Sequence, residues 1–174
     1  MESIFNNGTL TVKPKGRVDT SNEEVAVLHE VINSVPDSNT FIHGDIHPKN
    51  IMVHDDEPIF IDMASLTYGH RIFDYAGIAL THILAKDYIK HLFGIETDTA
   101  QRLYNNMIKA NFLGRTDEEL ERINRVIIGY AGIKYVLSPA INKAQNIEIN
   151  DRVIAKAKEQ IIPNANMLIG AIDF

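Results

Sequence analysis

Residues 43–50 read HGDIHPKN, a polar segment that places two histidines, one aspartate and one asparagine within eight positions. Two short apolar runs follow at 51–53 and 59–61, and the five residues HDDEP separate them. Short apolar runs joined by a brief polar loop predict a β-hairpin. If the loop is symmetric about its centre, Ile51 pairs with Ile61.

The same register sets Asn50 opposite Asp62 at the open end of the hairpin. Opposed residues of antiparallel strands have Cβ atoms about 5 Å apart, so an amide oxygen and a carboxylate can share Mg²⁺, whose oxygen ligands lie at about 2.1 Å. Asp45 stands five residues before Asn50, on a tight loop opened by Gly44. Phosphoryl transfer needs such a metal and a carboxylate that orients the acceptor hydroxyl and takes its proton. The sequence therefore predicts a phosphoryl-transfer site.

At these residues the chain resembles a known family. Residues 43–50 are similar to the H-G-D-x-H-x-x-N signature of the aminoglycoside phosphotransferase and choline kinase superfamily. Residues 61–64 (IDMA) and 69–76 (GHRIFDYA) resemble its second segment, I-D-x-x-x followed by G-x-x-x-x-D-x-A. The spacing D-x-x-x-x-N is also that of the protein-kinase catalytic loop, with Gly44 in the place of arginine. Two motifs in the right order indicate the superfamily strongly and the substrate weakly.

The resemblance implies a role for each matching residue. Asp45 would be the catalytic base, and His47 would lie near the phosphate transferred from ATP. Asn50 and Asp62 would hold Mg²⁺. Asp74 would be structural, accepting hydrogen bonds from the backbone of the catalytic loop at the start of a core helix. The two residues after Asp62 are methionine and alanine, not Phe-Gly, so the DFG switching of protein kinases does not carry over.

Each of these residues also has a simpler interpretation. Asp45 can be an ordinary turn residue, Asn50 can simply start a strand, and Asp62 can cap backbone amides that follow it. For His47, a packed or exposed histidine is nearly as common as a phosphate contact. His43 is expected to support the loop rather than to react.

Helices are expected around the hairpin. An N-cap at Ser21 or Asn22 and apolar residues at helical spacing predict a first helix that ends at residues 36–39. Further helices are predicted at about 73–92, from 97 or 98 to 114, from the capping box TDEE at 116–119 to about 137, and at 151–162. A short strand is expected at 9–12. The predicted fold is mainly α with a small β-hairpin (α+β), a protein-kinase-like C-terminal lobe.

The composition sets limits on function. The chain has 174 residues, 45% of them hydrophobic, and a net charge of −6, which disfavours a nucleic-acid surface. It has no cysteine, so disulfide and thiol chemistry are excluded. Neither a secretory signal nor an apolar run of the roughly 20 residues needed for a membrane span is visible. We expect a cytoplasmic protein that binds neither nucleic acid nor membrane.

Two kinase features are missing from the sequence. Neither G-x-G-x-x-G nor a V-A-I-K-like strand occurs in it. Because members of the superfamily resemble two-lobed kinases, we expect residues 21–174 to be a C-terminal lobe and residues 1–20 to be a remnant of the linker to an N-terminal lobe. The chain alone should then bind Mg-ATP weakly, have little or no activity, and self-associate through the face that the other lobe would cover.

Three functions remain open at this point. The first is an ATP-dependent phosphotransferase (kinase) acting on a hydroxyl of a small molecule such as an aminoglycoside, sugar or amino alcohol. The second is a non-catalytic, kinase-like lobe that serves as a binding module. The third treats residues 45–47 as the D-x-H motif of a metallophosphoesterase, which would need a G-N-H-D/E turn and later histidines. No such turn follows.

Overall fold

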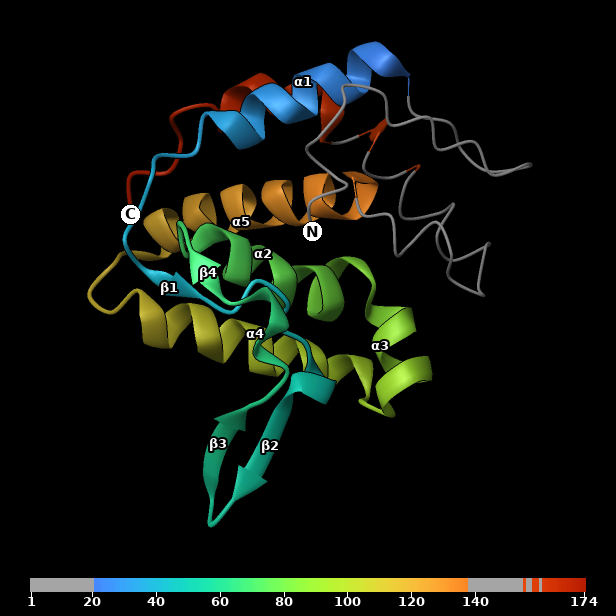
Figure 1. Ribbon diagram of the computed structural model, residues 1–174, viewed down its shortest axis with the longest axis vertical. Coiled ribbons are helices and arrows are strands. Elements are labelled where there is room, and N and C mark those ends of the chain that lie inside the picture. Colours follow the sequence, from blue (N-terminus) through green and yellow to red (C-terminus); the bar gives the residue numbers. More distant parts are fainter. Residues whose placement is uncertain (1–20, 138–154, 156–157, 160) are drawn as a thin grey trace.

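The computed structural model describes residues 21–137, 155, 158–159 and 161–174. Helices make up most of the described chain, and two small antiparallel strand pairs lie to one side of them (Figure 1). The predicted mainly-α fold with a small hairpin is therefore confirmed. The strand expected at 9–12 and much of the helix expected at 151–162 lie outside the described residues.

Helix α1 spans Asn22–Asn33 and begins as predicted. The Ser21 hydroxyl accepts a hydrogen bond from the Glu24 amide at 3.1 Å, and the Glu24 carboxylate accepts one from the Ser21 amide at 2.7 Å. This reciprocal capping box satisfies two backbone donors that the helix cannot use itself. The buried face of α1 carries Leu28 and Val31, both fully inaccessible to solvent.

The segment predicted as one helix at 73–92 is broken in the structure. It comprises α2 (Ile72–Ala79), a π-helical turn (η3, Leu80–Leu84) and α3 (Lys86–Phe93). The Thr81 hydroxyl and the His82 ring both hydrogen-bond backbone carbonyls of the preceding turn, and the Ala85 amide reaches back to the Leu80 carbonyl. Such side-chain bonds compete with the regular helical pattern. The prediction of an unbroken helix was wrong for this reason.

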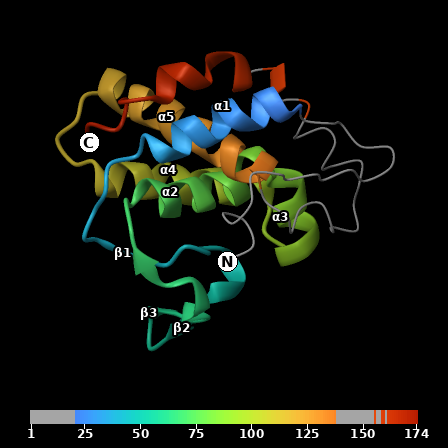
Figure 2. The same cartoon turned by 45° about the horizontal axis from the view of Figure 1, so that its top comes forward.

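Helices α4 (Thr97–Asn111) and α5 (Asp117–Leu137) agree with the predicted segments. The Thr116 hydroxyl accepts from the Glu119 amide, so the predicted capping box is present at the start of α5. Helices α2 and α5 lie side by side through the centre of the molecule, with α1 across one side of α5 (Figures 1 and 2). Ile72, Ile127 and Tyr130 belong to the core that these helices share. A 3₁₀ segment, η5 (Ile162–Leu168), packs against α1 and α5.

The hairpin exists, but its register differs from the prediction. Strand β2 (Ile51–His54) pairs with β3 (Glu57–Phe60), and Ile51 lies opposite Phe60 rather than Ile61. The loop consists of only two residues, Asp55 and Asp56, both with positive φ. This is the primed-turn geometry that matches the natural twist of a hairpin. The five-residue loop was therefore wrong, and Asp62 is not directly opposite Asn50.

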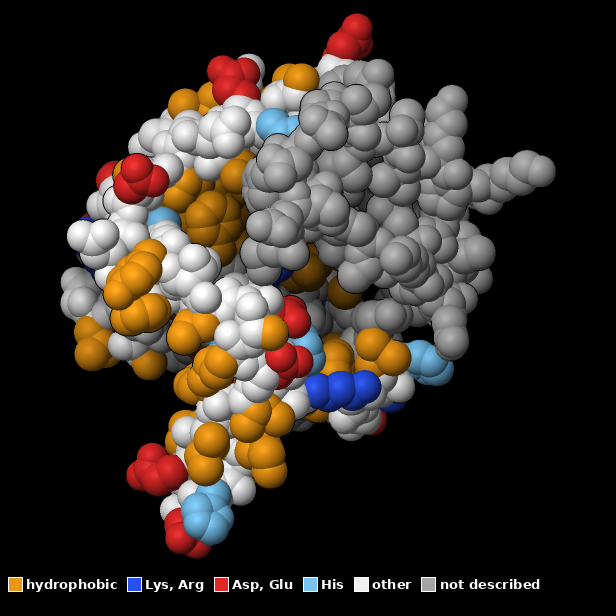
Figure 3. Space-filling model, in the orientation of Figure 1, with side chains coloured by type: hydrophobic (Ala, Val, Ile, Leu, Met, Phe, Trp, Pro, Cys, Tyr) orange, Lys and Arg blue, Asp and Glu red, His pale blue; other side chains and the backbone are white. Residues whose placement is uncertain are grey.

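A second strand pair anchors the hairpin region to the helices. Strand β1 (Phe41–Ile42), which was expected as an extended run, pairs with β4 (Thr67–Tyr68), which was not predicted. The hairpin itself projects away from the helices, and hydrophobic side chains lie exposed along it (Figure 3). Among the described residues, none of the helices combines the length and apolarity that a membrane span requires.

Candidate active site

Asp74 holds the loop at the start of the HGDIHPKN segment through hydrogen bonds to its backbone. Residue Asp74 lies in the first turn of α2, and its two carboxylate oxygens accept hydrogen bonds from the amides of His43 and Gly44, both at 2.8 Å. Gly44 has a φ of +80°, and a Cβ there would lie 2.7 Å from the Ser65 carbonyl oxygen. The position therefore requires glycine. The hydrogen bonds predicted for Asp74 are present.

His43 ties the loop to the end of the hairpin. Its ring is buried, with Nε2 at 2.9 Å from the Ile61 carbonyl oxygen. The Asp45 amide donates to Nδ1 at a longer 3.4 Å. These contacts agree with one neutral tautomer, in which Nε2 carries the proton and donates to Ile61. His43 thus supports the loop, as expected.

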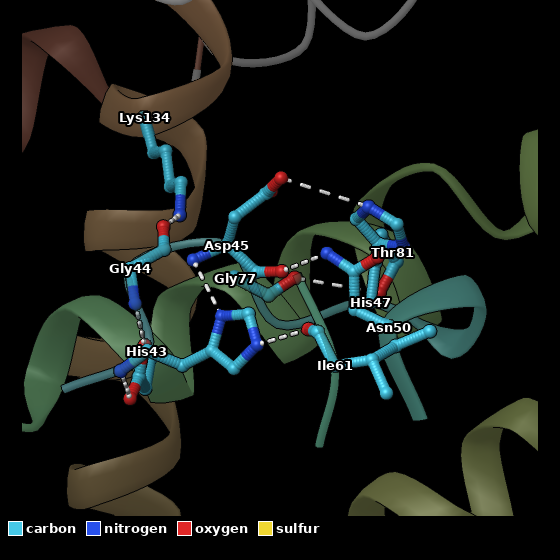
Figure 4. A network of polar contacts seen from close by, with 10 residues as sticks. His43, Gly44, Asp45, His47, Asn50, Ile61, Gly77, Thr81 and Lys134 are labelled. Carbon is cyan, nitrogen blue, oxygen red and sulfur yellow. Dashed lines mark hydrogen bonds and ion pairs between the residues drawn. The ribbon is translucent and has the colours of Figure 1, made fainter. Parts of the chain in front are cut away.

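Asn50 is the buried end of the same segment. It closes a 3₁₀ turn (η1, Pro48–Asn50), and its side-chain nitrogen donates to the Asp45 carbonyl oxygen at 3.0 Å (Figure 4). The backbone carbonyl of Asn50 accepts a hydrogen bond from the Ile61 amide at 3.0 Å. Because the amide nitrogen is committed to Asp45, the side-chain oxygen is the group left to bind a cation.

The side chains of Asp45 and His47 point toward one another (Figure 4). His47 Nε2 lies 3.7 Å from Asp45 Oδ2, and the Asp45 side chain is 55% exposed. The His47 ring packs against Phe93 at the end of α3, with 6.0 Å between ring centroids. Its Nδ1 is buried and has no hydrogen-bond partner within the part of the chain that the structure describes. The pair leaves a carboxylate open to solvent beside an imidazole.

Asp62 follows Ile61, the residue that contacts both His43 and Asn50. Its backbone is left-handed, with φ 58° and ψ 62°, and its carboxylate makes no capping hydrogen bond to the 3₁₀ turn η2 (Met63–Ser65). The simpler role as a cap is therefore absent. A left-handed aspartate costs about 1 kcal/mol, and such residues are frequent at functional sites.

The two side chains predicted as metal ligands have the donor chemistry that magnesium prefers. Mg²⁺ is usually bound through one or two protein oxygens together with substrate phosphates, and Asn50 and Asp62 offer an amide oxygen and a carboxylate. No group of three or more histidine, aspartate or glutamate side chains among the described residues is arranged to hold a metal ion.

One residue of this region was missed in the sequence. Lys134 of α5 donates from Nζ to the Gly44 carbonyl oxygen at 2.9 Å (Figure 4). The available signal was that Lys134 is the only charged residue in the stretch 126–137. A lone charge within an apolar helical stretch indicates a buried partner, but the sequence does not say which one.

A loop held by Asp74, an exposed carboxylate at Asp45 and a buried Asn50 bonded to the Asp45 backbone form the arrangement of a kinase-type phosphotransferase. Comparison with known proteins agrees. The family model described as "Phosphotransferase enzyme family" matches residues 13–104, about half of the chain, and this range contains both motifs. The chain therefore belongs to the phosphotransferase enzyme family, and the superfamily predicted from the two motifs is confirmed. No curated protein and no solved structure matches the chain.

Proposed function

We propose that this chain takes part in transferring the γ-phosphate of ATP to a hydroxyl group of a small molecule such as an aminoglycoside, sugar or amino alcohol. The placement of Asp45 carries the proposal. Its backbone is held by His43 and Asn50, whereas its carboxylate is 55% exposed. A fixed backbone with an open carboxylate suits a group that must meet a substrate in one orientation.

In the proposed reaction, Asp45 accepts the proton of the acceptor hydroxyl while the hydroxyl oxygen bonds to the γ-phosphorus of ATP. The bond from that phosphorus to the bridging oxygen breaks, and ADP leaves. Asn50 and Asp62 would hold Mg²⁺, which neutralises charge on the phosphates when it is bound. His47, 3.7 Å from Asp45, would lie beside the transferred phosphate.

Turnover should be slow for this chain alone. Its sequence has no glycine-rich phosphate loop and no V-A-I-K-like strand to supply a phosphate-binding lysine. Phosphoryl transfer depends on positioning and charge neutralisation, so the loss of these groups removes much of the rate enhancement.

The second candidate function is that of a non-catalytic binding module, and one observation favours it. Large apolar side chains are exposed on the two strand pairs: Phe41, Met52, Val53, Ile59, Phe60 and Tyr68. Large apolar side chains exposed in such number are typical of interaction sites. We propose that a second copy of the chain covers it.

Transfer of isotope-labelled phosphate from ATP to a panel of aminoglycosides, sugars and amino alcohols separates the two functions. We expect labelled product with the wild type, and a rate at least about 100-fold lower with Asp45→Asn, because general bases contribute on that scale. Asp56→Asn, at the exposed tip of the hairpin, is the matched control and should leave the rate unchanged. Equal rates for Asp45→Asn and the wild type, or no transfer to any acceptor, would contradict the catalytic proposal.

A further inference from the structure

Lys134 connects a distant helix to the catalytic loop. Its Nζ lies 2.9 Å from the Gly44 carbonyl oxygen, a contact between residues 90 positions apart in the sequence. Lys134 lies beyond the range 13–104 that matches the family model. The family assignment therefore says nothing about this residue, and the contact is a property of this chain's own fold.

The path of the lysine depends on Gly77 of α2. A Cβ at this position would lie 3.3 Å from Lys134 Nζ and 3.4 Å from the Ile46 carbonyl oxygen. The first distance is tight for a Cβ contact, and the second is an ordinary contact. An alanine at this position would therefore press on the lysine ammonium and push it by a few tenths of an ångström.

The peptide bond between Gly44 and Asp45 is held at both of its polar groups. Lys134 binds its carbonyl oxygen at 2.9 Å, and His43 Nδ1 accepts from its amide at 3.4 Å. Because a peptide unit is planar, contacts at both groups fix the rotation of the whole plane. The Cα of Asp45 belongs to that plane, and the next peptide is held as well, because Asn50 Nδ2 donates to the Asp45 carbonyl oxygen at 3.0 Å. With the peptides on both sides of this Cα held, the direction in which the Asp45 side chain leaves the backbone is fixed.

The charges around Lys134 favour the same arrangement. Burial lowers the pKa of its ammonium, whereas the carboxylates of Asp45 and Asp74 raise that pKa and so partly offset the effect of burial. A charged donor forms a stronger hydrogen bond to a carbonyl than a neutral donor does. The two carboxylates thus offset part of the cost of burying the ammonium beside the loop.

We propose that Lys134 is a positioning residue, which fixes the Gly44–Asp45 peptide and thereby aims the Asp45 carboxylate. The importance of that aim for catalysis rests on the function proposed above. The hydrogen bond between Lys134 and the Gly44 carbonyl does not depend on that function, because it is a contact within the chain. We call this contact the brace.

Nuclear magnetic resonance of the full chain tests the brace without any activity measurement. We expect Lys134→Met to shift the amide signals of Gly44 and Asp45 and to speed hydrogen exchange at the Asp45 amide about tenfold or more, because that amide belongs to the peptide that loses its hydrogen bond to a charged donor. Lys109→Met, at an exposed lysine of α4, is the matched control and should change neither property. Gly77→Ala keeps the lysine but narrows its path, and should shift the same two signals.

Two results would overturn the proposal. One is that the Gly44 and Asp45 signals of both variants coincide with those of the wild type. The other is that exchange accelerates equally at all core amides, which indicates a purely structural lysine. If Lys134→Met does not fold, Gly77→Ala decides the question by the same two criteria.

Activity adds a separate readout. Where the wild type transfers phosphate, Lys134→Met should lower kcat about tenfold with the KM for ATP unchanged, because the lost bond is within the loop. An equal kcat would count against the inference. If the wild type transfers no phosphate, the proposed function fails, but the amide signals still decide the role of Lys134.

Discussion

Lys134 and Asp74 bind opposite polar groups of the same residue, Gly44. The lysine ammonium donates to the Gly44 carbonyl at 2.9 Å, and the Asp74 carboxylate accepts from the Gly44 amide at 2.8 Å. One contact comes from α5 and the other from α2, the two helices that share the core. The loop that presents Asp45 is therefore fixed to two helices of the core.

Replacing Asp74 by asparagine should destabilise the chain. Asparagine is neutral and keeps only one acceptor oxygen, so one of the two loop amides loses its partner and the other keeps an uncharged one. A hydrogen bond to a charged group contributes about 1.5–3 kcal/mol, and we expect the free energy of unfolding in urea to fall by that amount. Asp56→Asn on the hairpin tip is the control. A change within about 0.5 kcal/mol of the wild type, the usual range for surface substitutions, would count against these hydrogen bonds.

Asp62→Asn should separate metal binding from folding. Asparagine tolerates the left-handed conformation of Asp62 as well as aspartate does, so the unfolding midpoint should not change. Removing the carboxylate should weaken binding of Mg-ATP, measured by calorimetric titration, about tenfold or more, the usual scale for losing a charged interaction. Binding of ATP without Mg²⁺ serves as the reference. Equal Mg-ATP affinity in the two proteins would mean that Asp62 is not a metal ligand.

The exposed strand surface should make the chain self-associate. Val53 is 70% exposed on β2, among the other apolar residues of the hairpin. We expect the mass from light scattering to rise with concentration, and Val53→Lys to lower that mass. Leu113→Lys is the matched control, because Leu113 is 84% exposed and lies after α4. A wild type that remains monomeric at the highest concentrations would contradict the proposal.

Stability should fall as the solution becomes acidic, and His82 should contribute. Burial lowers the pKa of His82 from its usual 6.5, an effect that a hydrogen bond to the Ile78 carbonyl partly offsets. The unfolded chain therefore binds more protons than the folded chain below pH 6.5. The contribution is complete above that pH and is lost as pH falls through the lower folded pKa. Urea unfolding at pH 7.5 and 5 should show a smaller loss for His82→Gln; an equal loss would exclude this role.

The loop at residues 43–50 could be predicted from the sequence because its residues lie close together in the chain. Asp45 and Asn50 lie within one short motif, and Asp74 belongs to the second motif at the start of a helix. The spacing placed Asp45 and Asn50 together, and the resemblance to the family supplied the role of Asp74. The start of the first helix could be predicted for the same reason, since the capping residues Ser21 and Glu24 are three positions apart.

Other features depend on the turn type and on contacts between side chains and backbone, for which the sequence carries no local pattern. The turn residues Asp55 and Asp56 lack the Asn-Gly or Asp-Gly pattern that signals a two-residue turn, so the hairpin register was off by one. The break after Ala79 arises from side-chain bonds to the helix backbone. The contact of Lys134 with the loop depends on how α5 packs against α2, which no local pattern encodes.

We propose that Asp45, Asn50 and Asp62 face one pocket that binds a metal-nucleotide complex. Mn²⁺-ATP in place of Mg²⁺-ATP tests it directly, because the paramagnetic ion broadens amide signals of nearby residues. We expect strong broadening of the signals of these three residues, and weaker broadening at Asp55 on the exposed hairpin tip, which lies further along the strand. Broadening at Asp55 equal to that at Asp45, or no broadening at Asp45, would show that the ion does not bind in this pocket.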